Sequence, residues 1–306
     1  MRYIDKSQNR ASGLANTSAF LNQHCLDANG RHTGIRYNST DPGVKDTFCA
    51  ADASRYRKTL TQLLLSEQHD LCCYCLRRLK TNQNEEYSDK KITLEHIIPR
   101  SYTSTHDVAY YRSAPGLSTN DVEITDVYES PGYGQQPHIH PHKVAYNNLV
   151  ASCNGTFPDV RNERQGKQKI CCNVARQTKQ AYPVYFMPNV ADFVDYLPDG
   201  DIQAVPGTPE ESHTATLIDS TNLQCDSLRQ IRYLWYLLRG EDWQTICDCN
   251  SSESERNYLF CKILYVAGVD PELANVLHIK FMKSDNWKTF MLYSVFYEIF
   301  RLKYPL

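Results

Sequence analysis

Twelve cysteines are many for a chain of 306 residues, and the spacing of some of them points to a metal centre. Two residues separate Cys72 from Cys75, a gap that lets both thiolates of a tight turn reach one tetrahedral zinc ion. Cys153 and Cys172 are the best candidates for the other half of the site, with Cys171 as a substitute. The alternative for the Cys72–Cys75 pair is two ordinary buried thiols, and packing instead of metal binding is the expected role of Cys73 and Cys171.

A carboxylate and an imidazole stand side by side at Glu95 and His96. Such a pair can divide the work of hydrolysis, because the carboxylate can hold a hard cation while the imidazole takes a proton from water. An isolated Glu-His pair is more often a surface acid beside a hydrogen-bonded histidine. Strict alternation along a strand would direct the two side chains to opposite faces, so the strand must twist or end there. Pro99 favours an early end.

Two asparagines accompany the remaining cysteine motifs. Asn148 begins the segment NLVASC, which ends in Cys153, and Asn173 follows Cys172 in CNVAR. An amide oxygen is a neutral ligand for a hard cation, and the whole amide group can clamp neighbouring backbone segments through hydrogen bonds. Taken singly, each asparagine is more often a helix cap or a turn residue.

Short elements must position these residues. Apolar residues at helical spacing predict a helix over residues 53–69, which leads into the first cysteine pair. A strand is expected over residues 91–99, a second short strand over residues 147–152, and a helix over residues 173–180. Residues 101–141 are rich in Tyr, Ser, Pro and Gly and are interpreted as a long insertion or loop.

The two ends of the chain differ in texture from this middle part. Residues 1–50 are interpreted as an irregular arm with one short helix over residues 16–24. Aromatic-rich helices are expected over residues 226–238, 258–266 and 287–302, after a turn that leads into a strand within residues 198–205. The sequence predicts the α+β class. The expected regions are residues 1–70 as an arm and helix, residues 71–185 as the metal-binding domain, and residues 186–306 as a mainly helical C-terminal domain.

Charge is unevenly distributed along the chain, although the net charge is only −2. Residues 1–180 carry 23 basic and 18 acidic residues, whereas residues 181–306 carry 10 and 17. This excludes a uniformly basic nucleic-acid coat, and only the first part could face a polyanion. Basic residues near the motifs that could grip phosphates, or simply form a solvated loop, are Arg100, Arg161, Arg164, Lys167 and Lys169.

Taken together, the stretches CCYC, EHIIPRS, NLVASC and CNVAR resemble, in this order, the motifs of the zinc-containing HNH endonucleases. The resemblance implies a ββα-metal nuclease core braced by a four-cysteine zinc ribbon. Two gaps depart from the family pattern. Eighteen residues separate Cys153 from Cys172, and about fifty separate EHIIPR from Asn147.

The resemblance also assigns roles. His96 matches the general base that activates the attacking water, and Glu95 matches a ligand of a catalytic Mg²⁺ or Mn²⁺ ion. Asn148 matches the residue that orients the base and its loop, and Asn173 matches the residue that completes the metal site. Four thiolates match the ligands of a structural zinc ion: Cys72, Cys75, Cys153 and Cys172.

Three stretches carry a further likeness: the start MRYIDK, the segment EQHDLCCYC, and the tail FVDYLPDGDIQAV followed by TATLIDSTNLQCDSLRQIR. Over roughly residues 1–240 the chain resembles PtuB-type HNH proteins of the Septu and retron-associated antiphage defence systems. That likeness implies a partner ATPase of the SMC/ABC-like PtuA type, and in retron systems a reverse transcriptase with its RNA–DNA product. The chain has no GxxxxGK[ST] phosphate loop of its own, which agrees with ATP being handled by a partner. DNA is the expected substrate. The aromatic C-terminal region could include a docking surface, although its aromatic residues are more often core.

Several alternatives stay open. The chain could be a stand-alone HNH restriction nuclease, a nuclease that cleaves RNA or tRNA, or a zinc-ribbon binding module without activity. The histidines at 138, 140 and 142 could form a second metal site, although a solvated loop is the more common outcome. The start of the sequence has no apolar segment typical of a signal peptide, and no stretch is apolar enough to cross a membrane. A cytoplasmic location is therefore expected.

Overall fold

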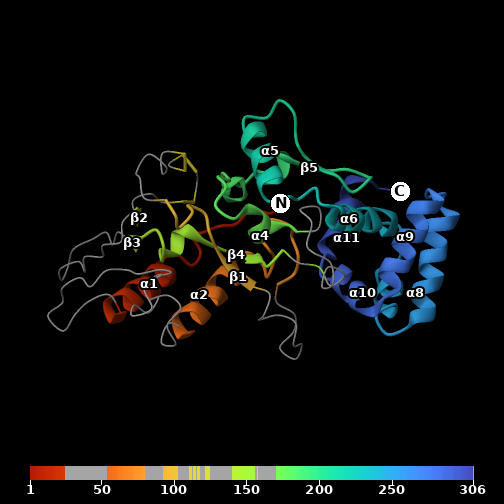
Figure 1. Cartoon of the computed structure of the whole chain (residues 1–306), viewed down its shortest axis with the longest axis horizontal. Coiled ribbons are helices and arrows are strands. Elements are labelled where there is room, and N and C mark those ends of the chain that lie inside the picture. Colours follow the sequence, from red (N-terminus) through yellow and green to blue (C-terminus); the bar gives the residue numbers. More distant parts are fainter. Residues whose placement is uncertain are drawn as a thin grey trace.

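The computed structural model describes residues 1–24, 54–79, 92–102, 110–111, 113–114, 116–117, 121–124, 140–155, 157 and 170–305. It combines helices with small two-stranded sheets, as the α+β class requires. Figure 1 shows α1 and α2 at one end of the long axis and α8 and α9 at the other, with β1, β4 and α4 between them.

The helices are α1 (Arg10–His24), α2 (Ser54–Glu67), α4 (Cys172–Arg176), α5 (Glu211–Ser220), α6 (Asp226–Leu238), α7 (Trp243–Asp248), α8 (Glu253–Phe260), α9 (Pro271–Met282), α10 (Ser284–Met291) and α11 (Val295–Lys303). The π-helix Cys261–Val266 continues α8, and short 3-10 turns cover Tyr146–Asn148, Val184–Phe186 and Val190–Asp192. The strands are β1 (Ile92–His96), β2 (Val122–Glu123), β3 (His140–Pro141), β4 (Leu149–Cys153), β5 (Val194–Tyr196) and β6 (Ile202–Ala204).

The central hairpin-like pair is β1 with β4, which run antiparallel. Ile92 faces Cys153 at one end of the ladder, and His96 faces Leu149 at the other. All five residues of β4 are buried, so this strand lies inside the core with neighbours on both faces. The ladder therefore separates the cysteine end of the pair from the histidine end, and α4 packs against β4.

The predicted elements around the motifs are present with shifted ends. The helix expected over residues 53–69 is α2, and Leu60 and Leu64 on its apolar face are completely buried. The strand expected over residues 91–99 ends at His96. The helix expected over residues 173–180 ends at Arg176, because Gln177 adopts a positive φ of 51° that no α-helix continues.

At the N-terminus the sequence interpretation was only partly right. The helix expected over residues 16–24 begins six residues earlier, at Arg10, inside the stretch interpreted as irregular. Its packing explains the extension, since α1 lies against α2 and the ring of Phe20 stacks on Tyr56 at 4.2 Å. Much of the insertion expected over residues 101–141 lies outside the described residues.

The last third of the chain is mostly helical, as predicted. The helix over residues 226–238 is α6 with the same ends. The single helix expected over residues 287–302 is two helices, α10 and α11, interrupted at residues 292–294. Tyr293 in this break is completely buried, and its hydroxyl lies 3.9 Å from Sγ of Cys75. The helix break thus places the Tyr293 side chain against Cys75.

Hydrogen bonds join the C-terminal part of the chain to the segments that carry the cysteine motifs. The amide of Arg78 donates to the carbonyl of Leu292 at 2.7 Å, and the amide of Cys172 donates to the carbonyl of Thr221 at 2.8 Å. One buried apolar cluster runs from Met1 to Phe300 across all three expected regions. Among the residues that the structure describes, no helix has the length and apolar character needed to cross a bilayer.

Candidate metal centre and active site

Four buried sulfur atoms come together at the Cys153 end of β4. The Sγ atoms of Cys72, Cys75, Cys153 and Cys172 all lie within 4.8 Å of one another. Sγ of Cys72 is 3.9 Å from Sγ of Cys172, and Sγ of Cys75 is 3.7 Å from Sγ of Cys153. Tetrahedral zinc with Zn–S bonds of about 2.3 Å would place its sulfurs about 3.8 Å apart. The four thiols that the spacing singled out therefore form a group of the right size for one structural zinc ion.

Local backbone geometry brings these thiols together. Leu76 takes a positive φ of 61°, which closes the turn after Cys75, and Cys172 takes one of 54° at the start of α4. The amide of Cys153 donates to Sγ of Cys72 at 3.3 Å, the kind of contact that stabilises a thiolate. Hydrogen bonds with neighbouring thiols, that from Cys171 first, lower the pKa of Cys153 to about 5. Burial raises the pKa of two other members of the group, Cys75 and Cys172, so only part of the group ionises easily by itself.

Cys171, the possible substitute ligand, lies outside the group. Its Sγ is 3.5 Å from Sγ of Cys172 and contacts the carbonyl of Gly155 at 3.9 Å. The chain approaches so closely here that a Cβ on Gly155 would lie 1.9 Å from the carbonyl oxygen of Cys171. Of the two adjacent cysteines, the structure thus selects Cys172 for the metal group.

A cleft of about 440 Å³ opens at the other end of the β1–β4 ladder. Glu95, His96 and Asn173 all contribute to its wall, so three of the four residues predicted for catalysis meet at one cavity. The remaining lining residues are Leu94, Pro99, Arg100, Ser101, Lys143, Gln177 and Thr178. Arg100 is thus the one basic residue of the predicted phosphate-gripping set that the structure describes, and it lies at the cleft.

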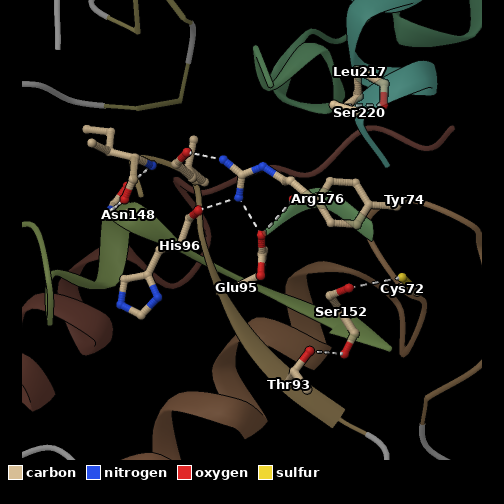
Figure 2. A network of polar contacts seen from close by, with 12 residues as sticks. Cys72, Tyr74, Thr93, Glu95, His96, Asn148, Ser152, Arg176, Leu217 and Ser220 are labelled. Carbon is tan, nitrogen blue, oxygen red and sulfur yellow. Dashed lines mark hydrogen bonds and ion pairs between the residues drawn. The ribbon is translucent and has the colours of Figure 1, made fainter. Parts of the chain in front are cut away.

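The Glu95 carboxylate is held by two donors. Arg176 forms a buried ion pair with Oε1 and also donates to the carbonyls of His96 and Ile97, at 2.5 Å each (Figure 2). The hydroxyl of Tyr74, from the Cys72–Cys75 turn, reaches the same oxygen at 3.5 Å. Among the described residues no donor bonds to Oε2. Burial raises the pKa of Glu95, and the charge of Arg176 opposes that rise.

His96 is oriented by a backbone carbonyl. Its Nε2 lies 2.8 Å from the carbonyl oxygen of Lys143, which can only accept, so Nε2 carries the proton and Nδ1 is the basic nitrogen of the neutral ring. Burial lowers the pKa of His96 to about 3, whereas the sequence alone suggested a value near 6.5. The neutral ring is therefore the resting form at any physiological pH.

The two side chains leave β1 in different directions. Figure 2 shows the carboxylate of Glu95 turned toward Arg176 and Tyr74, while the ring of His96 lies on the other side of the strand. This is the alternation that strand geometry predicts. Because β1 ends at His96, both residues still line the same cleft.

Asn148 lies behind the cleft instead of in it. Its Oδ1 accepts from the amide of Ile98 at 2.7 Å, and its Nδ2 donates to the carbonyls of Ile98 at 3.0 Å and His142 at 2.7 Å. The side chain is completely buried. It thus ties the segment that follows His96 to the segment that carries Lys143, the orienting partner of His96. Asn148 can position the imidazole without contacting it.

Sequence reasoning assigned no role to Arg176 or Tyr74. Each lies inside a motif that was singled out for its cysteines, CNVAR and CCYC. The helical spacing of Cys172 and Arg176, four residues apart, was the available signal for a shared helix face. No comparable signal marks Tyr293, which reaches the cysteine group from a helix break about 120 residues further along the chain.

The other candidates are placed as follows. Nε2 of His140 lies 2.9 Å from the hydroxyl of Ser18, and His142 is buried near Asn148. His138 and the basic residues Arg161, Arg164, Lys167 and Lys169 lie outside the described residues. Within the described part of the chain, the only group of three or more potential ligands is the four-cysteine group.

Comparisons of the chain with protein-family models and with curated proteins found no match.

Proposed function

We propose that the chain is a metal-dependent endonuclease of the HNH type. The observation that carries the proposal is the cleft at the end of β1, where Glu95, His96 and Asn173 meet beside a buried four-cysteine group. An acidic oxygen, an amide and a neutral imidazole are the groups that hydrolysis of a phosphodiester requires. Glu95 and His96 lie on β1 and Asn173 lies on α4, and β4 pairs with β1 and packs against α4. This order supports the ββα core that the motif resemblance implies.

In this proposal His96 is the general base. Its basic Nδ1 takes the proton of the attacking water while the Lys143 carbonyl holds Nε2–H. A pKa near 3 makes the free ring a weak base, but the negative charge of a phosphate in the cleft would raise it. Asn148 keeps the imidazole ring of His96 in place by bonding to the backbone of Ile98 and of His142.

Glu95 and Asn173 are the proposed protein ligands of a catalytic Mg²⁺ or Mn²⁺ ion. Oxygen ligands suit such hard cations better than thiolates do, and Arg176 leaves Oε2 of Glu95 for that purpose. A divalent ion there would supply the positive charge that stabilises the phosphate and the leaving oxygen. The cysteine group, by contrast, is proposed to hold zinc only as a brace.

The proposed substrate is DNA, and the proposed setting is an antiphage defence complex with an SMC/ABC-like ATPase of the PtuA type. The resemblance of the sequence to PtuB-type proteins supports this setting. A retron reverse transcriptase with its RNA–DNA product is a further proposed partner. Cleavage by the purified chain alone would favour a stand-alone nuclease, whereas cleavage only with the co-expressed ATPase would favour the complex.

Cleavage assays on variants test the proposal. Supercoiled DNA, single-stranded DNA and tRNA are incubated with the chain, with and without the ATPase, in Mg²⁺ or Mn²⁺. His96→Ala is expected to lower cleavage by at least about a hundredfold, the usual share of a general base. Its zinc content and unfolding midpoint serve as folding checks.

The matched control is His213→Ala. His213 is not among the residues that line the cleft. Its ring stacks on the ring of Tyr182, with 4.1 Å between the ring centres. This variant is expected to cleave like the wild type. If His96→Ala cleaves at the wild-type rate, the proposed base is wrong. If no substrate is cut under any condition while zinc is bound, the chain is a zinc-ribbon binding module instead.

A further inference from the structure

Helix α9 is apolar on two opposite faces. Ala274, Leu277 and Phe281 face the core and are buried. On the other side, Val276 is 49% exposed and Ile279 is 59% exposed. A helix that is apolar all round is normally covered on all sides, so the outer face of α9 is unusual for a surface helix.

Exposed apolar residues also lie on α8 and its π-helical extension, and α8 packs against α9. Tyr258 is 69% exposed, and Val266 is 82% exposed. His278 ties the two helices together, since its Nε2 lies 2.9 Å from Oδ1 of Asn257 and its Nδ1 lies 3.3 Å from the hydroxyl of Tyr265. Figure 1 shows α8 and α9 side by side at the end of the molecule opposite α1. We use the name α9 face for the surface formed by these exposed residues of α8, the π-helix and α9.

Charges at the two ends of α9 have opposite signs. Asp270 and Glu272 stand at its N-terminal end, and Lys280 and Lys283 stand at its C-terminal end. A parallel copy of the same helix would set acid against acid and base against base. An antiparallel copy sets opposite charges together and also opposes the two helix dipoles.

We propose that the α9 face binds the α9 face of a second copy of this chain, with the two α9 helices antiparallel about a two-fold axis at Val276. In this arrangement a residue a given number of positions before Val276 in one copy lies opposite the residue the same number of positions after Val276 in the other copy. Leu273 of one copy meets Ile279 of the other, and Glu272 of one copy lies in the layer of Lys280 of the other. The sequence of the exposed face is thus complementary to itself, which is the condition for a closed two-fold interface.

Self-complementarity distinguishes this occupant from an unrelated partner. Acidic N-terminal and basic C-terminal ends are common in helices, and Asp270 is the N-cap of α9, so the distinguishing feature is the pairing of Leu273 with Ile279 and of Glu272 with Lys280 about one residue. Nζ of Lys280 donates to Oε1 of Gln230 at 3.0 Å and to Oγ of Ser227 at 3.4 Å, so α6 fixes the position of this charge beside α9. The proposed interface lies on different elements from the cleft, so it does not depend on the proposed nuclease function.

Sedimentation equilibrium of the full chain, over about 1 to 100 μM, measures the association that a modest apolar interface would give. A shift of the average mass from one chain to two is expected over this range. Val276→Asp sets two carboxylates against each other at the axis and is expected to keep the chain monomeric throughout. Unchanged zinc content and an unchanged unfolding midpoint would show that this variant still folds.

Disulfide trapping tests the register. Because Cys261 is an exposed thiol on the same side of the molecule, all variants carry Cys261→Ser. Val276→Cys is expected to form a covalent dimer under mild oxidation, since position 276 meets itself at the axis. Leu273→Cys alone is expected to form none, while Leu273→Cys with Ile279→Cys restores cross-linking.

Charge reversal provides an independent check. Glu272→Lys is expected to weaken the dimer, and Glu272→Lys combined with Lys280→Glu is expected to restore it. A wild-type chain that stays monomeric up to 100 μM would overturn the proposal, as would a dimer that Val276→Asp leaves intact. In either case the α9 face would not be the surface through which two copies of the chain associate.

Discussion

Cys172 and Arg176 lie one turn apart on α4, so a single short helix carries both a member of the sulfur group and the ion-pair partner of Glu95. The turn between Cys72 and Cys75 repeats this relationship, because Tyr74 inside it also reaches the Glu95 carboxylate. Two of the segments that contribute sulfur atoms, the Cys72–Cys75 turn and α4, therefore also position the Glu95 carboxylate. Loss of the metal should disturb the cleft even though no cysteine lines it.

The ion pair of Arg176 with Glu95 yields the first prediction. Arg176→Gln leaves a carboxylate that is 4% exposed without its cation, and we expect a loss of about 3–5 kcal/mol in the free energy of unfolding. Because the Arg176 charge holds the pKa of Glu95 down, its removal raises that pKa further. In the proposed mechanism the carboxylate acts in its ionised form, so the acidic limb of the cleavage-rate profile should move to higher pH. Urea unfolding and a pH–rate profile measure the two effects.

Arg229→Gln is the matched control for that variant. Arg229 also pairs with a carboxylate, Asp201, but both side chains are partly exposed to solvent. Its loss should cost at most about 1 kcal/mol and leave the pH–rate profile unchanged. A profile for Arg176→Gln that coincides with the wild type would contradict the positioning role of Arg176.

The choice between the adjacent cysteines gives the second prediction. Cys153→Ser removes a member of the four-sulfur group and should abolish stoichiometric zinc binding, with a loss of at least about 3 kcal/mol in unfolding free energy. Cys171→Ser should retain one zinc per chain, because Cys171 lies outside the group. Elemental analysis of the purified variants, together with thermal unfolding, decides between them. Zinc lost from Cys171→Ser would mean that the ligand set is different.

Asn148 carries the third prediction. Asn148→Asp replaces the Nδ2 donor by an oxygen that faces the carbonyls of Ile98 and His142. Breaking these buried hydrogen bonds should destabilise the chain by about 2–4 kcal/mol. Cleavage should fall at temperatures where the variant is still folded and still holds zinc, since the backbone around His96 loses its tie.

Asn286→Ala offers a comparison for Asn148→Asp. Asn286 is also buried and donates to a carbonyl, that of Lys280, at 2.8 Å, but it lies in the C-terminal helices. It should lower stability without lowering the cleavage rate of the folded chain. Equal loss of cleavage in both variants, at equal folded fraction, would argue against a specific role for Asn148.

The buried ring of His96 makes stability depend on pH, which is the fourth prediction. In the unfolded chain His96 binds a proton below about pH 6.5, whereas in the folded chain burial lowers its pKa to about 3. The unfolded state therefore binds more protons between these values, and stability is lost as the pH falls through this window. The slope attributable to His96 should approach about 1.4 kcal/mol per pH unit well below pH 6.5.

Urea unfolding of the wild type and His96→Gln between pH 7.5 and 5.5 isolates this slope. Protonation of the cysteine ligands affects both proteins alike, so the difference between their slopes reports on His96. The wild type should lose stability faster than His96→Gln as the pH falls. Parallel curves would show that the ring titrates alike in the folded and unfolded chain.

Local spacing in the sequence was enough to predict most elements around the motifs and a group of cysteines that could share one metal ion. The two-residue gap between Cys72 and Cys75 lets both thiolates reach the same metal ion. Helical periodicity predicted both ends of α6 correctly. The Glu95–His96 pair could be located from its adjacent residue types, and because β1 ends before Pro99 both residues line one cleft. Each of these inferences concerns residues a few positions apart, where covalent geometry limits the possibilities.

Only the tertiary structure decided what meets across long separations. It brought Arg176 to Glu95, Asn148 to Ile98, and the break at Tyr293 to Cys75, none of which has a periodic signature. It also lowered the pKa of His96 far below its ordinary value, because burial depends on everything packed around a ring and not on its neighbours in sequence. Short-range spacing chose the chemical groups, and long-range packing set their orientation and their charge.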